Sequence, residues 1–206
     1  MNPASDKTAI KPRKTPRQAR SEATVEAILQ AAAHILERSG FDGYSTNAIA
    51  RVAGVSIGSL YQYFPTRDAI TYALIREQKV NLARDIMALE GAQNETSALT
   101  KIIEIAVQYQ LDRPALSRIL DLEEARLPQE PMQDAQSVTA VFRHALAALN
   151  YPTHDVVIRD LVAIIRGMVD AAGQNDRDPQ DDLTFRVEAA VFGYLERRWG
   201  GDTTHR

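Results

Sequence analysis

The chain has 206 residues, of which 45% are hydrophobic, so it can bury the core of one large domain or of a small domain fused to a larger one. It contains no cysteine, which excludes disulfides, a thiol nucleophile and a cysteine-based zinc site. Its four histidines lack metal-ligand spacing, so we expect no metal and no other cofactor. The net charge of −3 conceals an asymmetry, because residues 1–80 hold 11 Lys and Arg against 7 Asp and Glu, whereas residues 81–206 hold 13 against 20.

The first 16 residues form a basic leader. Six Lys and Arg within the first 20 residues face only Asp6, and the low apolar content of residues 1–16 predicts disorder. A basic end on an otherwise acidic chain is typical of a segment that binds a polyanion, and a solubilising tail is an equally good interpretation. The leader lacks the apolar run of a signal peptide, and no 18 consecutive apolar residues occur anywhere. We therefore expect a cytoplasmic protein with no membrane association.

The remaining sequence predicts an all-α fold, because apolar residues recur with helical spacing and no segment alternates with the period of a strand. Glycines, prolines and capping residues divide it into about nine helices. The expected helices span residues 17–39, 46–53, 56–64, 67–89, 95–111, 114–127, 130–149, 154–172 and 179–199. Gly40 is expected to end the first of them in the left-handed conformation, with Phe41 folding back on its last turn.

Residues 45–64 have the pattern of a helix-turn-helix motif. Ser45 or Thr46 can cap the first short helix, Gly54 breaks it, and Ser56 can cap the second. Two short helices joined in this way beneath a longer helix are typical of a DNA-binding unit.

The second short helix has two faces of different kinds. Leu60 and Phe64 are four residues apart and predict a buried face. The other face carries small, hydrogen-bonding and aromatic side chains, which suits close approach to phosphates and base edges. Its members are Ser56, Ile57, Gly58, Ser59, Gln62 and Tyr63, with Tyr61 on the flank. Tyr61 and Tyr63 could also be ordinary surface aromatics, but the neighbouring turn, caps and basic leader favour DNA binding.

The segment ILQAAAHILERSGFDGYSTNAIARVAGVSIGSLYQYFPTRDAI resembles the DNA-binding region of the TetR (tetracycline-repressor) family of bacterial transcriptional regulators. The resemblance lies in the pattern of the first helix, in the core IA..AGVS.GSLY..F and in the opening of the helix at Arg67. It covers about residues 20–75. Arg67 stands where the family usually has lysine and Tyr63 where histidine is commoner, and both can still bond a phosphate.

The resemblance implies an all-α homodimer with a DNA-binding domain at residues 17–66 and a helical domain for effector binding and dimerisation at residues 67–200. It further implies a repressor that a small-molecule effector releases from a palindromic, double-stranded DNA operator. The DNA-contact candidates that it carries over are Thr46, Ser56, Gly58, Ser59, Tyr61, Gln62, Tyr63 and Arg67, and Ile57 joins them from the pattern of the outer face.

The helices expected at 154–172 and 179–199 are apolar on nearly two sides. This predicts a dimer interface, and burial on both sides within one subunit is an equally good interpretation. The resemblance also places the dimer interface on the last two helices. The candidate interface residues are Leu161, Ile165, Met168, Val191, Phe192 and Leu195.

An effector pocket is expected to be lined mainly by residues 95–149, and its chemistry is not indicated. The candidates are Met87, Tyr109, Arg118, Phe142 and Arg143, with Asp121 and Glu124 as further charged residues. Surface salt bridges or plain packing account for such residues more often.

Two other classes of protein are disfavoured. An all-α enzyme is disfavoured because candidate catalytic groups are missing: the sequence has no phosphate-binding glycine loop and no histidine–carboxylate cluster. A DNA-binding architectural protein without an effector does not need the roughly 130 residues that follow the DNA-binding segment.

Overall fold

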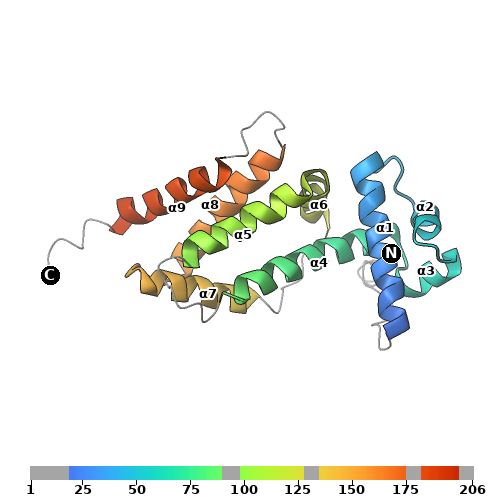
Figure 1. Ribbon diagram of the computed structural model, residues 1–206, viewed down its shortest axis with the longest axis horizontal. Helices are drawn as coiled ribbons and strands as arrows, with labels where there is room; N and C mark the ends of the chain where they lie inside the picture. Colours follow the sequence, from blue (N-terminus) through green and yellow to red (C-terminus); the bar gives the residue numbers. More distant parts are fainter. Residues whose placement is uncertain (1–18, 90–97, 128–134, 175–181, 200–206) are drawn as a thin grey trace, which may run out of the picture. The chain divides into compact units, whose positions relative to one another are not determined.

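The computed structural model describes residues 19–89, 98–127, 135–174 and 182–199. These ranges contain nine helices and no strand, which confirms the all-α prediction. The helices are α1 (Ala19–Ser39), α2 (Thr46–Val52), α3 (Ile57–Tyr63), α4 (Arg67–Met87), α5 (Ala98–Asp112), α6 (Pro114–Arg126), α7 (Ala135–Ala148), α8 (Asp155–Gln174) and α9 (Leu183–Trp199) (Figure 1). The basic leader, and the helix starts expected at residues 17, 95, 130 and 179, lie outside the described residues.

The described residues divide into two compact units. The first contains α1, α2, α3, α4 as far as Gln78 and α6 from Ala115, and the second contains α4 from Lys79 with α5, α7, α8 and α9. The first unit is therefore larger than the segment 17–66, because α6 belongs to it although α5 lies between α4 and α6 in the sequence. The boundary of the functional domains at residue 66 stays a prediction.

The core of the first unit is formed by the apolar stripe of α1 and the helices that pack on it. Ile28 and Leu36 of α1 are fully buried, and so is Leu60 of α3. The exit from α1 is as expected: Gly40 has φ +55°, and its N–H donates to the Leu36 carbonyl at 2.9 Å. Phe41 packs against the same core.

The contribution of α6 to this core was not expected from its position in the sequence. Leu116 and Leu120, four residues apart, are buried in the cluster that holds α1 and α3, and Leu127 joins them just after the helix ends. One stripe of leucines therefore anchors α6 within the first unit.

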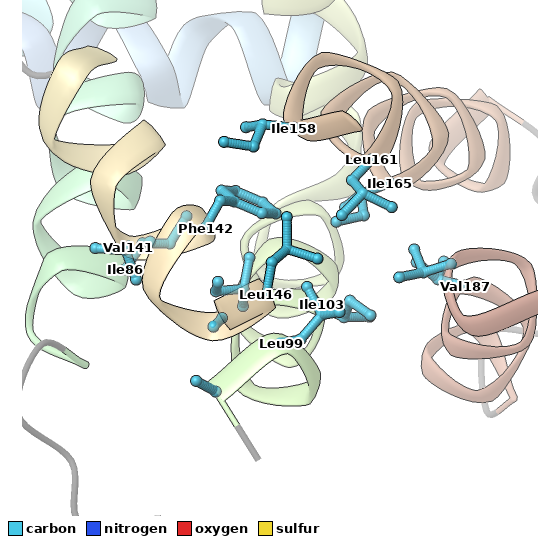
Figure 2. Packing of buried hydrophobic residues seen from close by; sticks show 14 of the residues in the cluster. Ile86, Leu99, Ile103, Val141, Phe142, Leu146, Ile158, Leu161, Ile165 and Val187 are labelled. Carbon is cyan, nitrogen blue, oxygen red and sulfur yellow. The ribbon is translucent and has the colours of Figure 1, made fainter. Parts of the chain in front are cut away.

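The second unit has its own core, to which α5, α7, α8 and α9 contribute buried side chains. Figure 2 shows Phe142 of α7, Leu161 and Ile165 of α8 and Ile103 of α5 pointing toward one another. None of the helices in the described parts of the chain is long and apolar enough to cross a membrane.

Four of the six predicted interface residues are contradicted by this core. Leu161, Val191 and Leu195 are 0% exposed and Ile165 is 5% exposed within a single chain. A side chain with almost no exposed surface has none left for a second subunit, so their assignment to a dimer interface is wrong. The alternative interpretation, burial within one subunit, holds for them. Met168 and Phe192 are half-buried and pack against the same core.

Candidate nucleic-acid interface

The turn between α2 and α3 is fixed by two capping serines and one glycine. Ser45 caps α2, because its Oγ accepts the N–H of Ala48 at 3.2 Å. Ser56 caps α3, because its Oγ accepts the N–H of Ser59 at 3.0 Å. Gly54 lies between them at φ +68°, a conformation that favours glycine. The predicted helix-turn-helix is therefore present, with caps and turn where the sequence indicates them.

The two faces of α3 separate as predicted. Leu60 is 0% and Phe64 is 1% exposed, and both lie in the core of the first unit. Ile57, in the first turn of the helix, is 38% exposed, and Tyr61 on the flank is 42% exposed. Gly58 and Gln62 are exposed beside them, and Ser59 is half-buried. We call the surface of Ile57, Gly58, Tyr61 and Gln62 the outer face of α3.

The two tyrosines of α3 differ from the expectation, which put Tyr63 on the outer face and Tyr61 on the flank. Tyr63 is half-buried and packs against the core, because it lies three residues after Leu60 at the edge of the buried stripe. Tyr61 is the more exposed ring, and its hydroxyl lies 3.1 Å from Thr46 Oγ1 at the start of α2. This hydrogen bond ties the outer face of α3 to the first residue of α2.

Arg67, the first residue of α4, is held over two aromatic rings. Its guanidinium carbon lies 5.6 Å from the ring centre of Phe41 and 5.9 Å from that of Tyr44. Its Nη1 also donates to the Tyr44 carbonyl at 3.4 Å. Because a guanidinium has five N–H donors and the side chain is 45% exposed, donors remain for a further acceptor such as a phosphate.

Tyr44 supports this arrangement from inside the unit. It is 2% exposed, and its hydroxyl accepts a hydrogen bond from Thr71 Oγ1 at 3.2 Å. Burial raises the pKa of Tyr44 to about 12, and the bond from Thr71 opposes the shift. Sequence reasoning missed Tyr44 and Phe41 as supports for Arg67. The one available signal was the pair of aromatic residues in the loop that follows Gly40.

The nine predicted DNA-contact residues all lie in the first unit, on α2, α3, the α3 cap and the start of α4. They are Thr46, Ser56, Ile57, Gly58, Ser59, Tyr61, Gln62, Tyr63 and Arg67. Their contact with DNA stays a prediction.

The predicted effector residues are not gathered into one unit. Arg118 is exposed on α6 in the first unit, and the other four belong to the second. The Tyr109 hydroxyl donates to Asp85 at 2.5 Å, Arg143 pairs with Asp155, and Phe142 is 3% exposed in the core. Met87 is half-buried against that core. Packing or pairing within the unit accounts for each of these four, and their contact with an effector stays a prediction.

Gln110 is a buried polar residue that sequence reasoning did not select. It is 5% exposed, and its Nε2 has no hydrogen-bond partner among the residues that the structure describes. Its amide packs against Gly173 of α8, where a Cβ would lie 2.1 Å from Nε2. The signal was a glutamine on the apolar stripe of Ile103 and Val107. Within the described ranges, no cluster of His, Asp or Glu could hold a metal ion.

The capped helices α2 and α3 have the arrangement of a helix-turn-helix protein. The outer face of α3 is exposed, and Arg67 is positioned beside it. Residues 28–74 match the family model described as "Bacterial regulatory proteins, tetR family". The helix-turn-helix segment of the chain is therefore similar to that of TetR-family regulators.

Curated relatives match less than half of the chain. It is 30% identical over 98 residues to the HTH-type transcriptional regulator RutR of Escherichia coli (strain K12), a match that covers 48% of this chain and 46% of RutR. It is 30% identical over 81 residues to the nucleoid occlusion factor SlmA of Glaesserella parasuis serovar 5, covering 39% of this chain and 40% of SlmA. The chain thus matches less than half the length of either relative.

Solved structures are similar over most of the chain. A putative TetR-family transcriptional regulator from Mesorhizobium loti aligns with a TM-score of 0.66 at 18% identity, covering 87% of this chain and 98% of the other. A TetR transcriptional regulator from Rhodococcus sp. RHA1 aligns with a TM-score of 0.59 at 23% identity, covering 85% and 97%. At these identities the likeness shows the fold.

Replacing Tyr44 by Phe should change how stability depends on pH. The folded state holds the Tyr44 proton up to a pKa of about 12, whereas the unfolded state releases it near the ordinary value of 10.0. Between these values the free energy of unfolding of the unmodified protein falls by up to roughly 1.4 kcal/mol per pH unit from this group. Tyr44→Phe lacks this loss. We therefore expect the stability difference between the two proteins to shrink in denaturant titrations as the pH rises through this window, and a constant difference would contradict the burial of an un-ionised Tyr44.

Proposed function

We propose that the protein is a sequence-specific DNA-binding transcriptional regulator, a repressor that a small-molecule effector releases from a palindromic operator. The observation that carries the proposal is the outer face of α3. Leu60 and Phe64 account for the packing of this helix, whereas Ile57, Tyr61 and Gln62 are exposed. Such a face, beside a positioned arginine, suits the major groove of duplex DNA.

Gly58 is the most informative residue of this face. It is not in the left-handed conformation, and the nearest atom to a Cβ built there is Ser56 Oγ at 3.9 Å. The fold therefore has room for a side chain, and a glycine within a helix lowers its stability. A glycine without an internal role, in the first turn of an exposed helix, suits the close approach of another molecule to the backbone.

The roles of the individual side chains follow from their chemistry. The Gln62 amide can pair with an adenine edge and Ile57 can contact a thymine methyl group. Tyr61, Tyr63 and Arg67 can bond phosphate oxygens, which fix orientation without reading sequence. A homodimer would present two such helices to successive major grooves about 34–36 Å apart.

The names of the relatives support DNA binding, but they differ in the cellular role that DNA binding would serve. RutR is named a transcriptional regulator and SlmA a nucleoid occlusion factor. Because both matches cover less than half of the chain, they do not extend to what the rest of either protein does. A DNA-binding role outside transcription, favoured by the SlmA matches, is the second candidate. Release from the operator by a small molecule would support the regulator over this candidate.

The effector site belongs, in this proposal, to the second unit. Gln110 supports this placement, because a buried donor without a partner is costly unless something accepts its hydrogen bond. An effector with a carbonyl or carboxylate oxygen would satisfy its Nε2.

The dimer interface is proposed on the outward faces of α8 and α9 rather than on their buried stripes. Ala163, Gly167 and Ala171 are exposed at a spacing of four residues along α8. On α9, Phe185 is 71% exposed, and the exposed Ala189 and Gly193 follow it at the same spacing. Small residues allow two helices to approach closely, and an exposed phenylalanine gains from being covered. The placement of the interface on the last two helices agrees with the resemblance to the TetR family.

Gly58→Ala should separate folding from DNA binding. Since the fold has room for the methyl group, the free energy of unfolding should stay the same or rise by up to about 1 kcal/mol. Affinity for duplex DNA should fall, because the methyl group lies where the backbone approaches the groove. The measurements are thermal unfolding and fluorescence anisotropy with labelled duplex.

Gly54→Ala is the matched control. It places alanine at φ +68° and should destabilise the first unit by roughly 1–2 kcal/mol. Full DNA affinity of a well-folded Gly58→Ala protein would contradict the proposed docking of α3.

Ala163→Glu should split the dimer. Ala163 is exposed on the proposed interface, so its charge would be buried without a partner only in the dimer. Light scattering should show a monomer, and operator affinity should fall by about 10²-fold or more, because two linked half-site contacts become one.

Ala147→Glu makes the same change at an exposed position of α7 and should leave the protein dimeric. Two variants that are both dimeric would show that this interface is misplaced.

A further inference from the structure

Arg126, the last residue of α6, is joined to the first turn of α4. Its Nη2 lies 3.1 Å from Asp68 Oδ1, and its Nη1 donates to Asp68 Oδ2 at 3.3 Å. The same guanidinium bonds Glu123 Oε2 through Nε at 2.8 Å and through Nη2 at 2.5 Å. Glu123 precedes Arg126 by one helical turn and holds the guanidinium in place, so Arg126 reaches Asp68 with a two-pronged contact between residues 58 apart in the sequence.

Asp68 lies within ion-pair distance of two arginines. Its Oδ1 is 3.1 Å from Arg126 and 4.0 Å from Arg67 Nε. Arg126 is the nearer partner and the only one of the two that bonds both carboxylate oxygens in the structure. Arg67 is instead oriented by the rings of Phe41 and Tyr44 and by the Tyr44 carbonyl.

A carboxylate at this place opposes the binding of a polyanion in two ways. Its charge repels a phosphate that approaches the neighbouring Arg67, and it competes with that phosphate for the Arg67 guanidinium. A cation held against the same carboxylate weakens both effects. The pKa of Arg126 is raised, first by its bonds to Glu123 and then by those to Asp68, so the side chain stays charged.

We propose that Arg126 is a positioning residue for DNA binding: it neutralises Asp68 and bonds both of its carboxylate oxygens, which leaves the Arg67 guanidinium available for a phosphate. The proposal rests on the proposed function. Arg126 is itself placed by the packing of α6, since Leu116, Leu120 and Leu127 lie in the core that also holds α3. The residue that prepares the phosphate contact thus comes from a helix outside the predicted DNA-binding segment.

The test is a double-mutant cycle with Arg126→Gln, Asp68→Asn and the combined variant. The probe is the duplex that the unmodified protein selects from a random pool, titrated by fluorescence anisotropy over a range of salt concentrations. We expect Arg126→Gln to lower affinity about tenfold, within the range of couplings between contacting residues. Asp68→Asn alone should change affinity little, and in the Arg126→Gln background it should restore most of the loss. Two residues that act independently would show no restoration.

Arg76→Gln is the matched control. Arg76 is exposed on α4 in the same unit, so this variant removes an equal charge away from Asp68 and should lose much less affinity than Arg126→Gln. A similar loss in both variants would mean a general effect of net charge and would overturn the proposal.

Two further readouts distinguish the positioning role of Arg126 from direct phosphate binding and from a purely structural role. If Arg126 bonded a phosphate directly, its loss would lower the slope of log affinity against log salt by about 0.9, and Asp68→Asn would not restore it. If Arg126 served only stability, Arg126→Gln would lower the unfolding temperature, and the combined variant would bind as weakly as the single one. Either result overturns the positioning role. Failure of the unmodified protein to select or bind any duplex would instead overturn the proposed function and, with it, this inference.

Discussion

The burial of Leu60 and Phe64 sets the rotation of α3 about its own axis. Burying each of these side chains contributes about 1.5–3 kcal/mol, so turning them outward would cost far more than any hydrogen bond on the exposed side returns. With these two residues inward, Gly58 and Gln62 point to the opposite side of the helix, and Ile57 and Tyr61 are exposed as well. The composition of the outer face is therefore free of packing requirements, and its polar and aromatic content points to recognition.

The start of α4 adds a second constraint of a different kind. Phe64 has extended backbone before Pro65, which ends α3 and lets α4 begin at Arg67. Arg67 is then fixed by aromatic rings, and Asp68 is fixed by Arg126 of α6. Packing sets the position of α3, and ion pairs and ring contacts set the charge beside it. Both belong to one compact unit with one core.

Features that depend on near neighbours in the chain could be predicted from the sequence. Ser56, Gly54 and the spacing of Leu60 and Phe64 specify the motif through contacts no more than a few residues apart. The contact of Arg126 with Asp68 could not be predicted, because no local pattern relates residues 58 apart.

The dimer interface could not be predicted from the helical spacing of apolar residues. Helical spacing identified the apolar stripes of α8 and α9, but it cannot tell whether a stripe packs on its own subunit or on another. Leu161 and Val191 pack on their own. The small exposed residues at Ala163 and Gly167 passed unnoticed, because alanine and glycine contribute little to an apolar pattern. The same limit applies to Tyr61 and Tyr63, whose exposure depends on a rotation of the helix that two apolar positions define only roughly.

If the outer face of α3 reads base sequence, Gln62→Ala is the variant that shows it most directly. The measurement is the affinity of the unmodified and variant proteins for the best duplex from a random selection, for the same duplex with each base pair changed in turn, and for unrelated DNA. We expect a loss of about 1–3 kcal/mol on the best duplex, a relaxed preference at one base position in each half-site, and little change on unrelated DNA. An equal loss on all of these duplexes, with the preference unchanged, would contradict base reading by this face.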